Sequence, residues 1–179
     1  ARTGVDASAV GALALRLADV HARDLADPRG AVALFEEAGA QGDDAIQVAA
    51  WWGLDKALDA LNDTAGRVEV LRKLTAFEGN AARASAWSFA SLLLASRDES
   101  EMEEGLTWIA WVQERSPDLA RAAQLLQATA AAWPERLSVL DLYERSAREA
   151  GDDTALLDVL ERRSASPGAS WGTLHQSVE

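Results

Sequence analysis

Asp27-Pro-Arg-Gly-Ala-Val-Ala-Leu-Phe35 is followed 36 residues later by Asp63-Thr-Ala-Gly-Arg-Val-Glu-Val-Leu71, without a gap. The flanking residues keep this spacing, so that Leu25 aligns with Leu61. A period in this range is typical of a helical repeat array, in which each unit is a helix hairpin that buries its apolar face against its neighbours. The repeated stretch therefore predicts a stack of helix hairpins.

The composition also favours helices. The chain has 179 residues, of which 49% are hydrophobic and 26% charged, enough for a domain with a substantial core. Aromatic residues make up only 6%, whereas the helix-forming residues Ala, Leu, Glu and Arg are abundant. We therefore expect an all-α protein.

Apolar residues at three-and-four spacing, interrupted by Gly, Pro and Asp, divide the chain into helices. Ser100 and Glu103 form a capping-box pattern that is predicted to open the sixth helix. The predicted helices cover about 6–25, 28–41, 44–61, 64–79, 81–97, 100–115, 119–133, 134–150 and 154–163.

These helices are predicted to form one repeat domain over residues 1–168, with hairpins at about 6–41, 44–79 and 81–116 and a less regular region at 118–163. After Pro117 two pairings remain open, because the helix from Pro134 pairs equally well with the helix before it or with the helix after Gly151. Residues 169–179 resemble the start of a further, truncated repeat.

Charge and cysteine content exclude several classes of function. The formal net charge of -12 argues against nucleic acid and against an anionic membrane surface as partners. Cys is absent, so there is no disulfide framework and no thiolate metal site. A cytoplasmic location is the default expectation, although the chain begins with Ala1 rather than Met, which is consistent with a mature product or an excised segment.

No residue pattern indicates catalysis. His21 and His175 lie far apart in the sequence, and neither has a second ligand at helical spacing, so no metal site is expected. The acidic pairs fall at predicted helix starts and turns, where they act as caps. The chain also lacks a Gly-rich phosphate loop and a nucleophile elbow. We therefore expect a protein that is not an enzyme and that binds no cofactor.

Two stretches resemble the second helix of the tetratricopeptide repeat family: Ala31-x-x-x-Phe35-x-x-Ala38 and Gly105-x-x-x-Ile109-x-x-Val112-x-x-x-x-Pro117. Asp27 and Asp152 resemble the acidic residue of the turn between the helices of that family. The resemblance covers about residues 10–117. It implies a right-handed superhelical stack of antiparallel helix hairpins, that is, an α-solenoid that binds proteins or peptides along its concave side.

The resemblance also places that concave side on the first helix of each hairpin. The implied positions are Leu13, Arg16, Val20 and Arg23; Ala49, Trp52, Lys56 and Asp59; and Trp87, Ala90, Leu94 and Arg97. Six of them form the predicted partner-binding face: Arg16, Arg23, Trp52, Lys56, Trp87 and Arg97. Cationic groups beside tryptophan indicate an extended peptide with acidic and apolar side chains.

The seven Trp residues bear on the alternatives. Trp51, Trp108 and Trp133 are predicted to fill the core, whereas Trp52 and Trp111 are predicted to be partly exposed. The favoured hypothesis is a non-catalytic scaffold or adaptor. The alternatives are a structural segment of a longer array, a protomer that self-associates through exposed Trp or its C-terminal repeat, and the sensing module of a larger enzyme or regulator.

Overall fold

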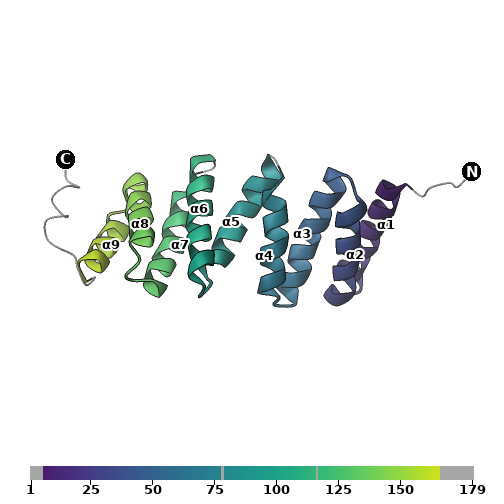
Figure 1. Ribbon diagram of the computed structural model, residues 1–179, viewed down its shortest axis with the longest axis horizontal. Helices are drawn as coiled ribbons and strands as arrows, with labels where there is room; N and C mark the ends of the chain where they lie inside the picture. The colour runs from purple at the N-terminus through teal and green to yellow at the C-terminus, as the bar shows by residue number, and fades with distance from the viewer. Residues whose placement is uncertain (1–5, 78, 116, 166–179) are drawn as a thin grey trace, which may run out of the picture. The chain divides into compact units, whose positions relative to one another are not determined.

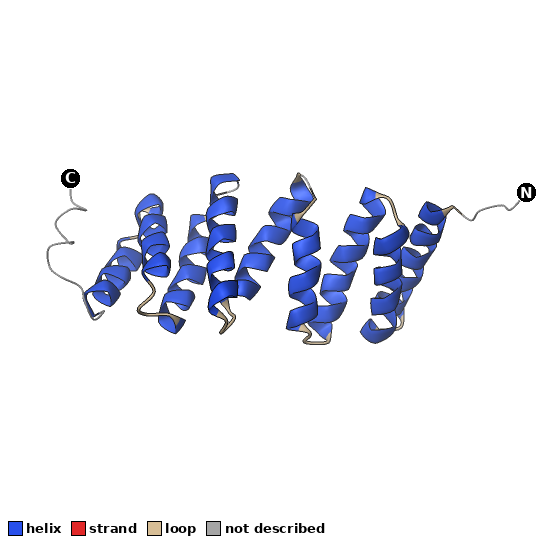
Figure 2. Cartoon of the chain, viewed as in Figure 1, coloured by secondary structure: helices blue, strands red, loops and turns tan. Residues whose placement is uncertain are grey.

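The computed structural model of this chain describes residues 6–77, 79–115 and 117–165. Every element in these ranges is helical, which confirms the all-α class for the described part of the chain (Figures 1 and 2). In chain order the elements are α1 Ala7–Asp19, the π-helical segment η1 Val20–Asp24, α2 Pro28–Gln41, α3 Asp44–Ala60, α4 Thr64–Thr75, α5 Asn80–Leu94, α6 Glu99–Arg115, α7 Leu119–Ala132, α8 Leu137–Ala150 and α9 Asp153–Ala165.

Four helix ends differ from the prediction. Helix α4 ends at Thr75 rather than near Gly79. The first helix does not stay α-helical to Leu25, because its last turn widens into η1, where the Leu25 amide bonds to the Val20 carbonyl oxygen. Helix α5 ends at Leu94 rather than near Arg97. Helix α8 begins at Leu137 rather than at Pro134, since a turn bonds the Arg136 amide to the Trp133 carbonyl oxygen.

The predicted capping box at the start of α6 is also wrong. Asp98 caps this helix, because its Oδ1 accepts a hydrogen bond of 3.0 Å from the Glu101 amide. Ser100 lies inside α6, one residue after the helix begins. Asp is as good an N-cap as Ser, so the sequence offered two caps two residues apart and the structure uses the earlier one.

The chain divides into two compact units, Ala1–Leu92 and Leu93–Glu179, and the division falls within α5. In the first unit, α1 to α4 are neighbours that alternate in direction (Figure 1). Each of these helices packs against the next, and α1 also contacts α3. This arrangement brings the first helices of the two repeated stretches together.

The core of the first unit joins bulky rings to glycines. Trp51 on α3 lies against Gly39 of α2, where an added Cβ would be only 2.5 Å from the indole. In the second contact the ring belongs to α2 and the glycine to α3: Phe35 lies against Gly53, and a Cβ on Gly53 would collide with the Phe35 ring. The two glycines therefore let α2 and α3 approach closely, each with a large ring fitted into the other helix.

An ion pair links α3 to α4. Asp55 is buried, and its Oδ1 accepts a hydrogen bond of 2.9 Å from Arg67 Nε. Arg67 also bonds to the exposed Asp59. The Asp55 contact is the main reason that the pKa of Arg67 is raised. The aligned positions of the first repeat, Asp19 and Ala31, cannot form this pair, so it belongs to the second hairpin alone.

In the second unit, α8 packs against both α7 and α9, and α6 contacts α7 and α8. Ile109, Leu126 and Tyr143 are among its fully buried side chains. Helix α8 packs against the helix before it and against the helix after it. The packing is therefore compatible with a hairpin of α7 and α8 and with a hairpin of α8 and α9, and the choice between them stays a prediction. The expected further repeat at 169–179 lies outside the described residues.

Among the helices of the described ranges, none is both long and apolar enough to cross a membrane.

Candidate functional site

The two copies of the repeated sequence start the second helix of each hairpin in the same way. Asp27 Oδ1 accepts a hydrogen bond of 3.0 Å from the Gly30 amide, and Asp63 Oδ1 accepts one of 2.9 Å from the Gly66 amide. The Gly30 bond, followed by the contact with His21, lowers the pKa of Asp27. The common cap gives α2 and α4 equivalent starts, which holds the first helices before them at equivalent positions.

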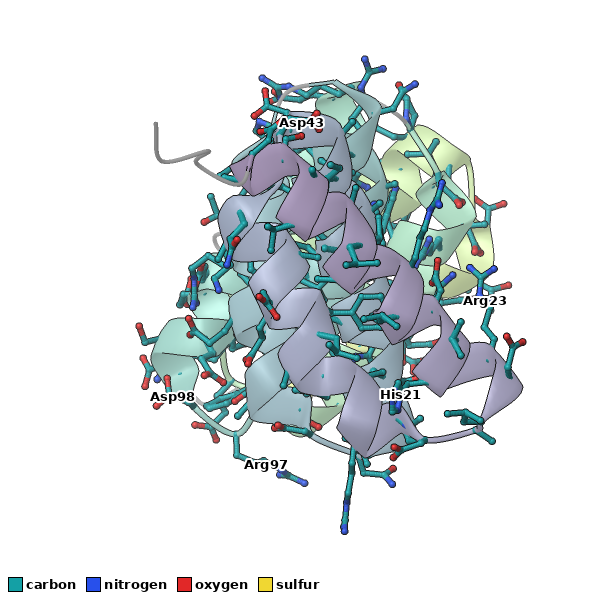
Figure 3. The ribbon with its side chains drawn as sticks, turned by 90° about the vertical axis from the view of Figure 1, so that its right-hand side faces the viewer. His21, Arg23, Asp43, Arg97 and Asp98 are labelled. Atoms are coloured by element: carbon teal, nitrogen blue, oxygen red, sulfur yellow. The ribbon has the colours of Figure 1, made fainter. Side chains whose placement is uncertain are left out.

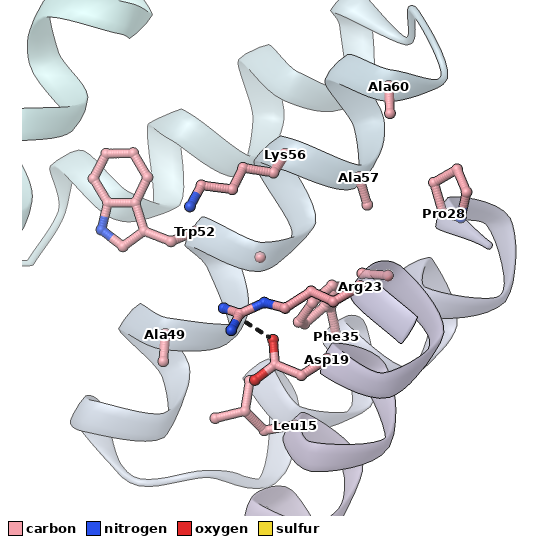
Figure 4. A pocket seen from close by; sticks show the side chains of 12 residues that line it. Leu15, Asp19, Arg23, Pro28, Phe35, Ala49, Trp52, Lys56, Ala57 and Ala60 are labelled. Atoms are coloured by element: carbon pink, nitrogen blue, oxygen red, sulfur yellow. Dashed lines mark ion pairs between the residues drawn. The ribbon is translucent and has the colours of Figure 1, made fainter. Parts of the chain in front are cut away.

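A pocket of about 380 Å³ opens between the first helices of these two hairpins (Figure 4). Its volume is typical of sites that hold a small ligand or a few peptide side chains. The lining residues come from α1, η1, α2 and α3: Leu15, Asp19, Ala22, Arg23, Pro28, Phe35, Ala49, Trp52, Gly53, Lys56, Ala57 and Ala60.

The pocket combines an apolar base with cations at its edge. The half-buried Trp52 forms one side, and Lys56 and Arg23 extend toward the same region from α3 and η1 (Figure 4). Arg23 Nη2 lies 3.7 Å from Asp19 Oδ1, and both side chains are well exposed, at 76% and 44%. Such an exposed pair is worth about 0–1 kcal/mol. A ligand carboxylate can therefore compete with Asp19 for Arg23, and Lys56 gives the pocket one positive charge in excess.

The structure brings together three of the six predicted partner-binding residues, namely Arg23, Trp52 and Lys56. Arg16 is exposed on α1 but does not line the pocket. Arg97 is exposed in the second unit, whose position relative to the pocket is not defined (Figure 3).

The prediction that Trp87 lies on an open binding face needs correction, because this side chain is only 7% exposed. Ala90 and Leu94, assigned to the same face, are buried as well. Helix α5 carries buried residues around most of its circumference: Ala82, Ser85, Ala86, Trp87, Phe89, Ala90, Leu93 and Leu94. A helix that is apolar on nearly all sides gives no signal for which face is open, so extending the repeat register to α5 failed.

Sequence reasoning missed part of the pocket. Leu15, Phe35 and Gly53 form its base but were assigned to the core or left without a role. Asp19 had a usable signal, since it precedes Arg23 by four residues and such pairs meet on a helix surface. No sequence pattern predicts the contact between Phe35 and Gly53. It joins two helices, and the sequence does not determine how these helices are rotated relative to each other.

The remaining predictions for tryptophan are met in part. Trp51 is buried, as predicted, and Trp52 and Trp111 are partly exposed, also as predicted. Trp108 and Trp133 are only half-buried rather than core residues. Trp108 packs edge-on against Trp111 with ring centroids 5.4 Å apart, and the Arg115 guanidinium lies 4.4 Å from the centroid of the Trp111 ring. These side chains belong to α6 and lie outside the pocket.

In the part of the chain that the structure describes, no group of three or more His, Asp or Glu side chains is arranged to hold a metal ion. Comparisons of the chain with protein-family models, curated proteins and solved structures gave no match. The pocket in the first unit is therefore interpreted from its own geometry.

Proposed function

We propose that the chain is a non-catalytic scaffold or adaptor whose first unit binds an extended peptide of a partner protein. The observation that carries this proposal is the pocket in which Trp52, Lys56 and Arg23 converge over an apolar base. A soluble peptide can place an apolar side chain against Trp52 and a carboxylate between the two cations. Both interactions are typical of peptide recognition by helical repeat proteins.

The same proposal includes a tetratricopeptide-like stack of helix hairpins. It is supported by the recurrence of the α1–α2 hairpin as α3–α4 at a spacing of 36 residues, with Asp27 and Asp63 as equivalent caps. The pocket lies where such a stack would present its binding side, on the first helices of adjacent hairpins. The repeat therefore supports this arrangement of the first four helices and a binding role for the pocket between them.

The pocket favours an acidic ligand over a neutral one. The whole chain carries a net charge of -12, so long-range electrostatics repel an acidic peptide. Binding must therefore come from local contacts with Lys56 and Arg23, whose strength falls when salt screens them. Because salt screens the long-range repulsion as well as these contacts, Lys56→Glu isolates the contribution of the contacts better than a salt titration does.

The test is selection from a displayed library of extended peptides, followed by calorimetric titration of the selected peptide. We expect selection of Asp or Glu next to an apolar residue. Trp52→Ala should weaken binding at least about tenfold by removing the apolar wall, and Lys56→Glu should do so by reversing a charge.

Trp111→Ala is the matched control, because Trp111 is another half-buried tryptophan, on α6, and does not line the pocket. The Trp111→Ala variant should bind the selected peptide with the affinity of the wild type. If the selected peptides bind Trp52→Ala and Lys56→Glu at full strength, the pocket is not the binding site.

A further inference from the structure

Most of the large hydrophobic side chains that the described residues expose lie on one helix. Six such side chains are exposed, and four of them belong to α1 and its continuation: Leu13 (60%), Leu17 (45%), Val20 (42%) and Leu25 (60%). Leu137 and Leu157 are the other two, and they lie on different helices. A concentration of this kind is a mark of an interaction surface.

The four residues form a continuous stripe, which we call the α1 outer face. Leu13, Leu17 and Val20 are spaced by four and three residues and so lie on one side of the helix. The opposite side of α1 carries the small residues Gly11, Ala14 and Ala18, which are buried against the rest of the unit, together with the partly buried Leu15. Figure 3 shows α1, in purple, among the helices nearest the viewer.

The sequence repeat indicates which kind of element can pack on the α1 outer face. Gly53 lies 36 residues after Leu17, and its position on α3 is covered by the Phe35 ring of α2. The equivalent position on α1 carries Leu17, which is exposed. A helix therefore covers this position in α3, and the position is open in α1. Because Leu17 is larger than Gly53, the covering helix must present a small residue opposite Leu17.

Charge indicates the chemistry of that helix. Arg16 and Arg23 follow Leu13 and Val20 by three residues each, and both are exposed along one edge of the stripe. Arg16 forms no ion pair with another described residue, and Arg23 has only the long contact with Asp19. Asp24 is the exposed acid at the far end of the stripe. An amphipathic helix edged with carboxylates would meet the two arginines.

A second copy of this chain fits the α1 outer face less well. In an antiparallel pair of α1 helices, Leu13 of one copy would face Leu17 of the other, and this register brings the two Arg16 side chains together. Like charges at that place oppose the pairing. The face thus fits a different helix better than it fits itself.

We propose that the α1 outer face, edged by Arg16 and Arg23, binds an amphipathic helix of a partner protein whose apolar stripe is flanked by Asp or Glu. The apolar stripe of this docking surface lies outside the pocket, since Leu13, Leu17, Val20 and Leu25 do not line it, and Arg23 is common to both sites. Variants of Leu13, Leu17 and Arg16 therefore test the α1 outer face, and variants of Trp52 and Lys56 test the pocket.

The probes are two synthetic helical peptides of about 18 residues whose apolar stripe, at three-and-four spacing, alternates Leu with Ala so that a small residue can face Leu17; the stripe is flanked by Glu in one peptide and by Lys in the other. Binding to the intact chain is followed by the fluorescence anisotropy of a dye on the peptide. We expect the Glu peptide to bind at least about tenfold more tightly than the Lys peptide. The Leu13→Ser, Leu17→Ser double variant should lose at least about tenfold in affinity for the Glu peptide, and Arg16→Glu should remove the preference.

Leu137→Ser is the matched control, because Leu137 is equally exposed, at 63%, on α8. This variant and Trp52→Ala should bind the Glu peptide like the wild type, and circular dichroism should show unchanged helix content in every variant. Equal binding of both peptides to the wild type and the double variant would overturn the proposal. So would a wild-type dimer in sedimentation that the double variant converts to a monomer, because a second copy would then be the occupant.

Discussion

Asp27 and Asp63 are the residues that most directly connect the sequence repeat to the structure. Each accepts the amide of the glycine three residues later, and in each case a Cβ on that glycine would crowd the capping carboxylate. The lowered pKa of Asp27 shows that this interaction favours the charged carboxylate. In both copies of the repeat the sequence shows an Asp followed three residues later by a Gly, so the starts of α2 and α4 could be predicted.

Replacing Asp63 by Ala should lower the free energy of unfolding by about 1 kcal/mol, because the Gly66 amide loses its acceptor at the start of α4. Urea denaturation followed by circular dichroism measures the change. Asp63→Asn is the control, since Asn caps as well as Asp and should retain most of the stability. A loss that is as large for Asn as for Ala would show that charge, and not the hydrogen bond, is what Asp63 contributes.

At the scale of elements, the helices could be predicted but some of their faces could not. Helix α3 alternates buried and open positions, and Trp52 and Lys56, which the family resemblance placed on one face of this helix, both line the pocket. Helix α5 is buried on most sides, so the same register misplaced Trp87. The π-helical turn of η1 also rotates the residues after Val20 around the helix axis. No residue type in this turn predicts that the α-helix changes to a π-helix there.

The ion pair between α3 and α4 gives a sharp prediction. Arg67→Met should cost about 3 kcal/mol of unfolding free energy, because the buried Asp55 carboxylate then has no cation beside it. The Asp55→Leu, Arg67→Met double variant should recover most of the loss, since an apolar pair of similar volume needs no partner. Urea denaturation gives all three values.

Arg23→Met is the control for this prediction, because Arg23 belongs to the exposed pair with Asp19 and its loss should cost less than about 1 kcal/mol. Equal costs for Arg67→Met and Arg23→Met would mean that the burial of Asp55 contributes nothing to the pair.

For the whole molecule, charge is the dominant property. The chain has 17 basic and 29 acidic residues, which gives the net charge of -12, and its exposed ion pairs are individually weak. Self-repulsion of the folded state is then larger than the attraction that salt removes. The free energy of unfolding should therefore rise when NaCl increases from about 20 mM to about 300 mM.

Chemical denaturation with urea, which is uncharged, measures this dependence on salt. Glu36→Gln, Glu149→Gln should flatten it, because both acids are exposed and each substitution removes one negative charge. A stability that falls with salt would show that the ion pairs, and not the repulsion, determine the response.

The rings that fit against glycines in the first unit also restrict which sequence changes this unit can accept. Trp51 cannot coexist with a larger residue at Gly39 without overpacking of about 1–3 kcal/mol, and Phe35 stands in the same relation to Gly53. A larger residue at either glycine should therefore be tolerated only together with a smaller side chain in place of the ring. Each ring and its glycine are expected to behave as one unit of substitution.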